Sequence, residues 1–278
     1  MNKADMITST SNPQVKFLRS LHLAKHRSES GLFLVEGLKL VGQAFDSNAE
    51  IQQIIISPEW LISDYGKSLV DLAIKKQIDI LELSTNAFES IARKDKPQGI
   101  AALAKQNWRD INTLNLNDEN QKRIYLAIEA IQNPGNLGTV LRTCDATGVS
   151  ALFLLPNSTD PYDPVAVKAS MGAIFTTPIF KLDYAQLAQI TRALDDLSII
   201  GTSDKAEQNA FTYPYSDNTL LLIGSEREGL SAQLSALCHE MVRIPMIGAC
   251  DSLNLSMATG IILYEIFNQH NGIKRNHD

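Results

Sequence analysis

Short apolar runs alternate with amphipathic stretches along the second half of the chain. Apolar runs of this length predict buried strands, and apolar residues spaced three and four apart predict helices. The runs predict strands near 124–130, 151–155, 198–202, 219–224 and 241–244, and helices near 136–147, 163–171, 184–196, 231–238 and 254–269. Strands that alternate with helices in this way favour an α/β fold around a mostly parallel sheet.

The first hundred residues show a second alternation of their own. The pattern predicts helices at 15–28, 37–45, 68–77 and 84–92, and strands at 33–37, 51–57, 78–83 and 99–105. Residues 106–122 are polar, lack a hydrophobic period and are rich in Asn and Asp, as linkers are. A chain of 278 residues with 44% hydrophobic content has room for two ordinary cores. We therefore predict a small α/β domain over 1–105, a linker over 106–122 and a larger α/β domain over 123–278.

The segment 132–148, QNPGNLGTVLRTCDATG, follows an apolar strand and leads into a helix. Pro134 and Gly135 predict an irregular turn, and Asn136 is a good helix-cap residue. Ordinary turns before helices share these features. The glycine patterns of dinucleotide-binding folds and of P-loops are both missing, which argues against a conventional nucleotide site.

Two further strands end in polar loops. In 220–231, LLLIGSEREGLS, a buried strand runs into a charged loop, and in 244–260, IPMIGACDSLNLSMATG, Ser252 and Asn254 are helix-cap types that precede an apolar helix. Ligands bind at the carboxyl ends of strands in open α/β sheets. The three loops therefore predict one shared ligand site, although each alone also fits a capped turn.

Taken together, the three loops closely resemble the three signature motifs of the SpoU family, also called the TrmH family, of RNA ribose 2′-O-methyltransferases. The resemblance spans residues 123–270, and KASMGAIFTTP at 168–178 resembles an intermediate segment of the family. The N-terminal region is similar to the family's small substrate-binding domain, which is related in fold to RNA-gripping ribosomal proteins. The residues that carry the resemblance in the three loops are Asn133, Pro134, Gly135, Asn136, Gly138, Arg142, Gly224, Glu226, Gly229, Pro245, Ser252, Leu253, Asn254 and Ser256.

The resemblance implies a SPOUT methyltransferase domain whose C-terminal segment forms a trefoil knot, a feature that periodicity alone does not reveal. It implies S-adenosylmethionine as the cofactor, RNA as the substrate and a homodimer with the cofactor pocket at the interface. The implied catalytic residues are Arg142, Asn136, Glu226, Ser252 and Asn254. The implied cofactor-binding residues, acting through their backbone, are Leu222, Gly224, Ile244, Met246 and Leu253.

Arg142 is the central residue of this implied site. A guanidinium holds its proton far more tightly than the usual general bases, so it is a poor proton acceptor. We expect Arg142 to hold the target ribose and an adjacent phosphate through paired N–H donors, which lowers the cost of alkoxide development. The proton would leave to phosphate, to water or to a transiently neutral Arg142.

The net charge of −6 is unevenly distributed along the chain. Residues 1–108 carry 13 Lys and Arg against 12 Asp and Glu, whereas residues 109–278 carry 12 against 19. RNA binding requires cations that neutralise phosphates, so the first domain is the expected contact region. The candidate RNA-binding residues are Lys16, Arg19, Lys25 and Arg27, each of which also fits a solvated helix face.

Cys144, Cys238 and Cys250 are scattered, and the histidines show no metal-ligand spacing, so the sequence predicts no disulfide framework and no metal site. No apolar run approaches 18 residues, and the N-terminus has no apolar signal core, which predicts a cytoplasmic protein without a membrane span.

Three alternatives stay open from the sequence. The two-domain architecture favours ribosomal RNA as the substrate, with transfer RNA as the alternative. A catalytically inactive RNA-binding protein with this fold is the alternative from another class, although the motif residues are intact. An oxidoreductase on a conventional Rossmann fold lacks its glycine fingerprint.

Overall fold

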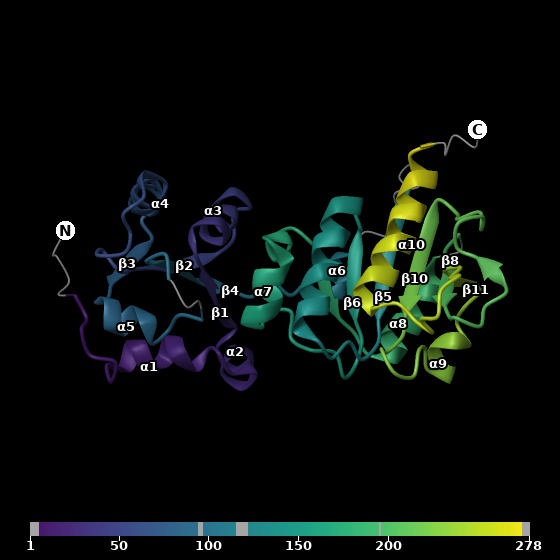
Figure 1. Cartoon of the computed structure of the whole chain (residues 1–278), viewed down its shortest axis with the longest axis horizontal. Helices are drawn as coiled ribbons and strands as arrows, with labels where there is room; N and C mark the ends of the chain where they lie inside the picture. The colour runs from purple at the N-terminus through teal and green to yellow at the C-terminus, as the bar shows by residue number, and fades with distance from the viewer. Residues whose placement is uncertain (1–5, 94–96, 115–121, 195, 274–278) are drawn as a thin grey trace. The chain divides into compact units, whose positions relative to one another are not determined.

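The computed structural model describes residues 6–93, 97–114, 122–194 and 196–273. The chain forms two compact units. The first contains Met1–Asn107 together with Asp160–Phe175, and the second contains Trp108–Thr159 together with Thr176–Asp278. The segment Asp160–Phe175, which lies within the predicted second domain, therefore packs with the first unit. Figure 1 labels most of the elements of both units.

The first unit is built on a four-stranded mixed sheet in the order β1-β4-β2-β3. β2 and β3 are parallel, and β4 is antiparallel to both of its neighbours. The strands are β1 (Leu32–Glu36), β2 (Ile51–Ile56), β3 (Asp79–Glu82) and β4 (Ile100–Lys105). The helices are α1 (Pro13–Ser20), α2 (Ala24–Ser30), α3 (Leu38–Asp46), α4 (Asp64–Lys75), α5 (Thr85–Glu89), α7 (Pro164–Ser170) and the 3-10 helix η2 (Ala173–Phe175).

The helix predicted over 15–28 is two helices, because the chain turns between α1 and α2. Val15, Leu18 and Leu21 are buried in the same core cluster, so α1 presents one apolar face to the sheet and ends when that face is complete. The carbonyl of Leu21, at the end of α1, accepts a hydrogen bond of 2.9 Å from the guanidinium of Arg27. That bond satisfies a carbonyl which the end of the helix leaves without a helical partner.

Arg27 is buried, with 1% of its side chain exposed. Its Nε lies 2.7 Å from Asp160 and its Nη2 lies 3.4 Å from Asp163, both in the segment that packs with the first unit. Tyr162 in the same segment packs against Phe33, with ring centroids 4.7 Å apart. The candidate RNA contact at Arg27 is therefore wrong, because two carboxylates neutralise this guanidinium and protein covers it.

The second unit contains a seven-stranded sheet in the order β7-β6-β5-β10-β8-β11-β9, in which every pairing is parallel. The predicted α/β fold with a parallel sheet is confirmed. The strands are β5 (Arg123–Ile128), β6 (Ala151–Leu154), β7 (Ile179–Lys181), β8 (Ser198–Thr202), β9 (Gln208–Asn209), β10 (Asn218–Ile223) and β11 (Glu240–Arg243). The helices are η1 (Ile111–Thr113), α6 (Pro134–Thr147), α8 (Tyr184–Ala193), α9 (Ala232–Ser235) and α10 (Leu255–His270).

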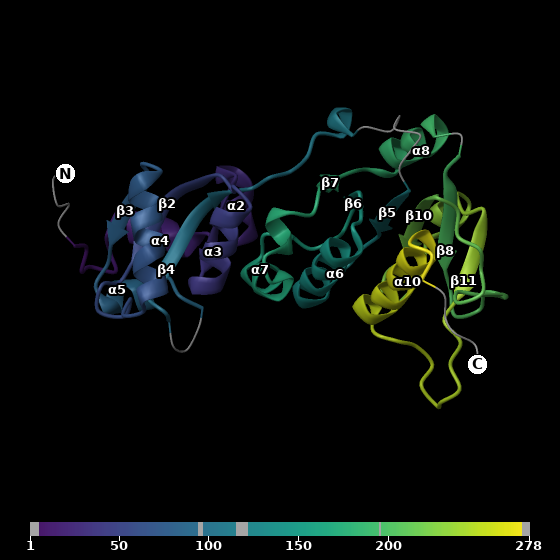
Figure 2. The same cartoon turned by 90° about the horizontal axis from the view of Figure 1, so that it is seen from above.

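Helices cover both faces of this sheet. α6 and α10 pack against each other on one face, and α8 lies on the opposite face, as Figure 2 shows. Residues from β5, β6, β8 and β10 form one apolar core, which extends to α8 through Leu187 and Ile190. This arrangement leaves the carboxyl ends of the parallel strands at one edge of the sheet.

The predicted linker contains some structure. Trp108 forms a parallel bridge with Ile179, and the short helix η1 follows it. Residues 115–121 of the predicted linker lie outside the described residues.

Candidate active site

The candidate site lies at the carboxyl ends of β5, β10 and β11, where the three motif loops begin. After β10 the chain folds back tightly, and Ser225 and Gly229 exchange two backbone hydrogen bonds of 2.9 and 3.1 Å. A Cβ placed on Gly224 would lie 2.0 Å from the carbonyl carbon of Gly229, so only glycine allows this close approach. The loop carries Glu226 at an exposed position at the edge of the sheet.

Each motif supplies one polar side chain, and hydrogen bonds connect the three side chains in a row. The side-chain nitrogen of Asn136 donates to the carboxylate of Glu226. The side-chain nitrogen of Asn254 donates to the side-chain oxygen of Asn136 over 3.2 Å. The side-chain oxygen of Asn254 accepts from the backbone N–H and the hydroxyl of Ser256, at 2.9 and 2.7 Å. The structure thus joins three of the five predicted catalytic residues.

The direction of these hydrogen bonds follows from the N-terminus of α10. Asn254 caps this helix, as predicted, so its oxygen must face the free backbone N–H groups. Its NH₂ group then faces Asn136, which must present its own oxygen there and its own NH₂ to Glu226. The carboxylate, which can only accept, ends the row. The orientation of both amides is therefore fixed by one helix terminus and one charge.

Asn136 does not cap α6, contrary to the prediction. Asn133 is the cap, and its side-chain oxygen accepts from the N–H groups of Gly135 and Asn136. Pro134 occupies the first helical position, where a missing N–H costs nothing. Asn136 lies inside the first turn of the helix, which leaves its side chain free to bond to the other two motifs.

Arg142 and Ser252 lie near the bonded residues Asn136 and Asn254 in the sequence. Their side chains are not bonded to these residues. Arg142 is exposed on α6, six residues or about 9 Å of helix after Asn136. Among the described residues, none forms an ion pair or a hydrogen bond with the Arg142 guanidinium. Ser252 is exposed two residues before the cap of α10. Both side chains are therefore available to a ligand.

The predicted cofactor-binding residues are divided between buried and exposed positions. Leu222 and Gly224 are buried at the end of β10, whereas Ile244 and Leu253 are half-buried and Met246 is 39% exposed. Figure 2 shows the loop between β11 and α10 extending away from the sheet.

This loop offers unpaired backbone together with apolar side chains. Within the described chain, no hydrogen bond joins the backbone of residues 244–253 to another residue. Free N–H and C=O groups beside Ile244, Met246 and Leu253 suit a ligand that combines an apolar ring with polar edges. The residues therefore fit the adenosine part of S-adenosylmethionine, which has both features.

Glu129 is a feature of the site that sequence reasoning missed. It follows β5 directly and is 7% exposed. Its carboxylate accepts from the hydroxyl of Tyr184 at 2.6 Å and from the backbone N–H of Ser231 at 3.0 Å. Ser231 caps α9 and closes the loop that carries Glu226, so Glu129 anchors that loop. The sequence signal that could have identified Glu129 is an acidic residue directly after an apolar strand.

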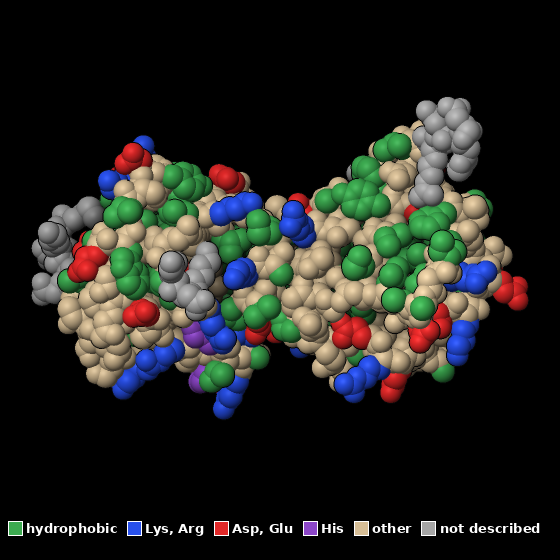
Figure 3. All heavy atoms as spheres, in the orientation of Figure 1, with side chains coloured by type: hydrophobic (Ala, Val, Ile, Leu, Met, Phe, Trp, Pro, Cys, Tyr) green, Lys and Arg blue, Asp and Glu red, His purple; other side chains and the backbone are tan. Residues whose placement is uncertain are grey.

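The three remaining RNA-contact candidates lie on α1 and α2. Lys16, Arg19 and Lys25 are exposed, and Lys25 lies 3.8 Å from Glu29. Figure 3 shows basic and histidine side chains over these two helices. A face of this kind can contact phosphates.

Other kinds of site have less support. Among the described residues, no group of three or more His, Cys, Asp or Glu side chains could hold a metal ion. No described helix has both the length and the apolar character that a membrane crossing requires.

The chain matches two family models. The model of the SpoU rRNA Methylase family matches residues 123–264, and that of the MRM3-like substrate binding domain matches residues 12–102. The chain is 30% identical to the 23S rRNA (guanosine(2553)-2′-O)-methyltransferase RlmP of Bacillus subtilis, over 94% of this chain and 98% of the relative. It is 26% identical to the 23S rRNA (uridine(2479)-2′-O)-methyltransferase of Streptomyces viridochromogenes, over 87% of this chain and 85% of the relative.

A solved structure agrees with these matches. The AdoMet-bound rRNA methyltransferase from Sinorhizobium meliloti is 31% identical and superposes with a TM-score of 0.85, over 97% of this chain and 98% of that one. The roles of the individual site residues and the trefoil knot stay predictions. The predicted family is confirmed: the chain belongs to the SpoU rRNA methylase family.

Proposed function

We propose that this protein transfers the methyl group of S-adenosylmethionine to a ribose 2′-hydroxyl of ribosomal RNA. Relatives of nearly the same length are named as 23S rRNA 2′-O-methyltransferases, and a solved neighbour is an AdoMet-bound rRNA methyltransferase. The hydrogen-bonded set Glu226–Asn136–Asn254 is the observation that carries the proposal, because it draws together one polar residue from each motif. Arg142 lies on the same helix as Asn136, and its guanidinium has no bonding partner among the described residues.

The cofactor, when bound, supplies a sulfonium methyl group that is already activated for attack. The protein must then hold the ribose hydroxyl in line and stabilise the charge that develops on its oxygen. Arg142 carries five N–H donors in a rigid, planar fork. In our proposal it binds the target ribose and its adjacent phosphate, and the hydroxyl proton leaves to phosphate, to water or to a transiently neutral Arg142.

The remaining polar residues position the reaction. Glu226, Asn136 and Asn254 form a fixed set of donors and acceptors at the edge of the sheet, and exposed Ser252 adds a hydroxyl next to it. The loop at 244–253 would receive adenine and ribose through its unpaired backbone, with Leu222 and Gly224 closing the site at the end of β10.

We also propose that the protein acts as a homodimer in the cytoplasm. Apolar side chains are exposed on the cofactor loop and along α10, with Ile247 fully exposed, Met257 at 59% and Tyr264 at 47%. Burial of these side chains against a second copy would remove apolar surface from water. Sedimentation equilibrium should give twice the mass of the chain, and an active monomer would contradict the dimer.

The function is tested by mapping ribose methylation across total RNA from cells with and without this chain. One or more ribosomal 2′-O-methyl groups should disappear in its absence. Loss of a methyl group from transfer RNA alone would contradict the proposed substrate. Calorimetric titration distinguishes a methyltransferase from an oxidoreductase, since S-adenosylhomocysteine should bind to this protein and NAD should not. An unchanged methylation map would leave an RNA-binding protein without catalysis as the better description.

The role of Arg142 is tested by Arg142→Lys, which keeps the charge and removes the fork. We expect methyl transfer to slow by about 100-fold, because bidentate positioning is lost, with the affinity for S-adenosylhomocysteine unchanged. A variant with the wild-type rate and the wild-type RNA affinity would show that the fork has no role.

A further inference from the structure

The turn after β10 presents a second arginine beside the candidate active site. Arg227 follows Glu226 directly and is exposed. Among the described residues, none forms an ion pair or a hydrogen bond with the Arg227 side chain. The adjacent carboxylate of Glu226 accepts from Asn136 instead. The guanidinium of Arg227 is therefore available to a ligand, as that of Arg142 is.

Hydrogen bonds hold the backbone of this turn. Ser225 and Gly229 exchange two backbone bonds, and the hydroxyl of Ser225 accepts from the N–H of Glu228 at 3.1 Å. Arg227 is the middle one of the three residues that Ser225 and Gly229 enclose, so it lies at the tip of the turn. Binding to Arg227 therefore has to order one side chain only, because the backbone is already held.

Positive charge is scarce around the site. Residues 109–278 carry 12 Lys and Arg against 19 Asp and Glu. The three motif loops comprise residues 132–148, 220–231 and 244–260. These loops contain only two cations, Arg142 and Arg227. RNA gains much of its affinity for proteins from cations that neutralise phosphates. An RNA strand that reaches the site therefore meets two arginines of the motif loops.

The two arginines lie near the bonded pair Asn136–Glu226 but start from different elements. Arg142 follows Asn136 on α6 by about 9 Å of helix, and Arg227 is about 3.8 Å of backbone from Glu226. In the proposed function, Arg142 holds the target ribose and one adjacent phosphate. A ribose within an RNA strand has a phosphate on each side, so one flanking phosphate still lacks a donor. The planar fork of a guanidinium matches the oxygens of a phosphate.

We infer that Arg227 binds the second phosphate that flanks the methylated ribose. The inference rests on the proposed function, since it assumes an RNA ribose as the substrate. A phosphate contact carries no sequence information, so Arg227 positions the RNA and does not select a base. The contact forms before methyl transfer and persists through it, so it strengthens RNA binding without accelerating the chemical step.

The test is filter binding of labelled rRNA, prepared from cells that lack this protein, to the full chain over a series of KCl concentrations. Arg227→Gln removes the charge and keeps a polar side chain. It should weaken binding about tenfold and reduce the slope of log affinity against log salt by about 0.7–1, as the loss of one phosphate contact does. Arg227→Lys keeps the charge, and its slope should equal that of the wild type. An unchanged slope in Arg227→Gln would overturn the inference.

Arg192→Gln is the matched control. Arg192 is also exposed in the second unit and has no bonding partner among the described residues. It lies in the last turn of α8, which runs back from the carboxyl end of β7 to the amino end of β8, so it is at the far end of the helix from the site. This variant should keep the wild-type affinity and slope. Equal losses in Arg192→Gln and Arg227→Gln would mean that net charge alone governs binding, against the inference.

Methyl-transfer assays on the same rRNA distinguish a substrate contact from a structural role. Arg227→Gln should raise KM for the RNA about tenfold and leave kcat unchanged, because the lost contact acts equally before and during the reaction. If Arg227 only shaped the turn, its loss would displace Glu226 and kcat would fall instead. A lower kcat with an unchanged KM would therefore refute the phosphate contact.

Titration with S-adenosylhomocysteine separates the remaining outcomes. Both variants at position 227 should bind it as the wild type does. Weaker binding would contradict the inference, because the guanidinium would then hold the carboxylate of the cofactor. A wild-type protein that shows the Arg227-dependent salt slope but transfers no methyl group would refute the proposed methyl transfer and leave Arg227 as a phosphate contact. Methyl transfer with equal slopes in the wild type and Arg227→Gln would refute this inference alone.

Discussion

The side-chain amide of Asn136 donates a hydrogen bond to the carboxylate of Glu226, although 90 positions separate the two residues in the chain. The bond crosses from the first turn of α6 to the tight loop after β10. The oxygen of the same amide accepts from Asn254. Asn136 therefore links all three motif loops by hydrogen bonds. Its value to the site lies in having both a donor and an acceptor, which neither a carboxylate nor a hydroxyl reproduces in this geometry.

Asn136→Asp should therefore disable the site without unfolding it. The new carboxylate would face Glu226 and repel it, while an acidic residue in the first turn of α6 is favourable for the helix. We expect kcat to fall at least tenfold, with the urea midpoint and the affinity for S-adenosylhomocysteine nearly unchanged.

The reciprocal change at the partner provides the control. Glu226→Gln combined with Asn136→Asp returns a donor and an acceptor to the pair, now in reverse order, so the double variant should recover part of the lost rate. A double variant that is slower than Asn136→Asp by the full cost of Glu226→Gln would show that the two side chains act independently.

The elements of the second unit were predictable because its parallel strands are buried on both faces and appear as continuous apolar runs. β7 and β9 escaped prediction, since runs of three and two residues carry too little periodic signal. In the first unit, the prediction of one helix over 15–28 failed because the chain turns between α1 and α2. The prediction of Arg27 as a surface cation failed separately. Burial of an arginine depends on carboxylates that follow more than 130 positions later, which local patterns cannot show.

Within the site, the motif residues were available from the sequence but their connections were not. Asn133 and Asn136 are equally good cap types, and the fixed backbone of Pro134 decides between them. The burial of Glu129 against Tyr184 and Ser231 depends on tertiary contacts. Sequence therefore identified the participants, and the fold determines which one bonds to which.

Gly224→Ala should destabilise the fold of the second unit. An added Cβ would lie 2.0–2.1 Å from backbone atoms of Gly229 and Leu230, and backbone cannot move aside as a flexible side chain can. We expect the free energy of unfolding to fall by about 3 kcal/mol, as measured by urea denaturation. Gly248→Ala is the control, because a Cβ there meets nothing within 4 Å, and its change should stay within about 0.5 kcal/mol. Equal changes in the two variants would show that the close approach at Gly224 is not what requires glycine.

Arg27→Met should release the segment Asp160–Phe175. The substitution leaves Asp160 and Asp163 without their cation, and breaking a fully buried pair typically costs about 3–5 kcal/mol. These carboxylates are 24% and 26% exposed, so water recovers part of the loss and we expect about 2–3 kcal/mol.

The measurement for Arg27→Met is urea denaturation together with limited proteolysis of the segment. Lys25→Met is the control, since Lys25 is 78% exposed and its contact with Glu29 is a surface ion pair. That variant should differ from the wild type by less than about 0.5 kcal/mol. If cleavage within the segment were equally slow in both variants, Arg27 would not be its anchor.

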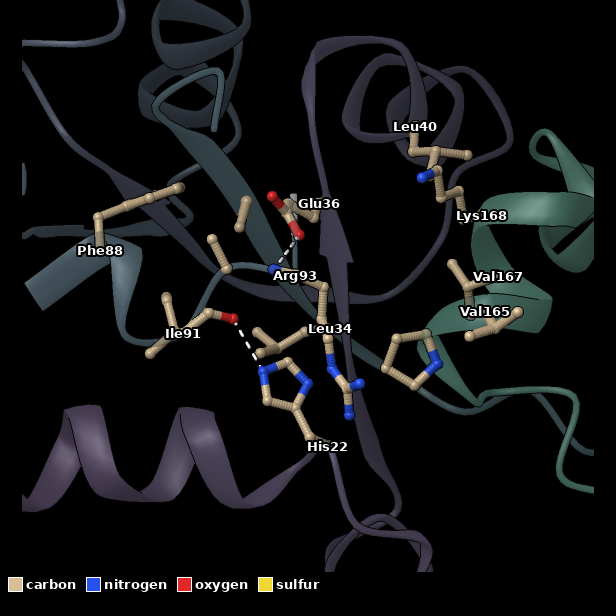
Figure 4. Close-up of a pocket in the computed structure, with 13 residues that line it drawn as sticks. His22, Leu34, Glu36, Leu40, Phe88, Ile91, Arg93, Val165, Val167 and Lys168 are labelled. Carbon is tan, nitrogen blue, oxygen red and sulfur yellow. Dashed lines mark hydrogen bonds between the residues drawn. The ribbon is translucent and has the colours of Figure 1, made fainter. Parts of the chain in front are cut away.

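His22 should make the protein less stable in mild acid. Burial, followed by the nearby Arg93 charge, lowers the pKa of His22 in the folded protein below the 6.5 of the unfolded chain. As pH falls through 6.5, the unfolded chain therefore binds the proton first, and folding loses the contribution that is fully present at higher pH. His22→Gln keeps an N–H for the carbonyl of Ile91, which lies 2.9 Å from the ring Nε2 (Figure 4), but does not titrate. Between about pH 7.5 and about pH 5, the free energy of unfolding from urea titrations should drop further in the wild type than in His22→Gln. Parallel pH profiles for the two proteins would mean that the His22 ring is protonated equally in the folded and unfolded states, which would contradict the lowered pKa.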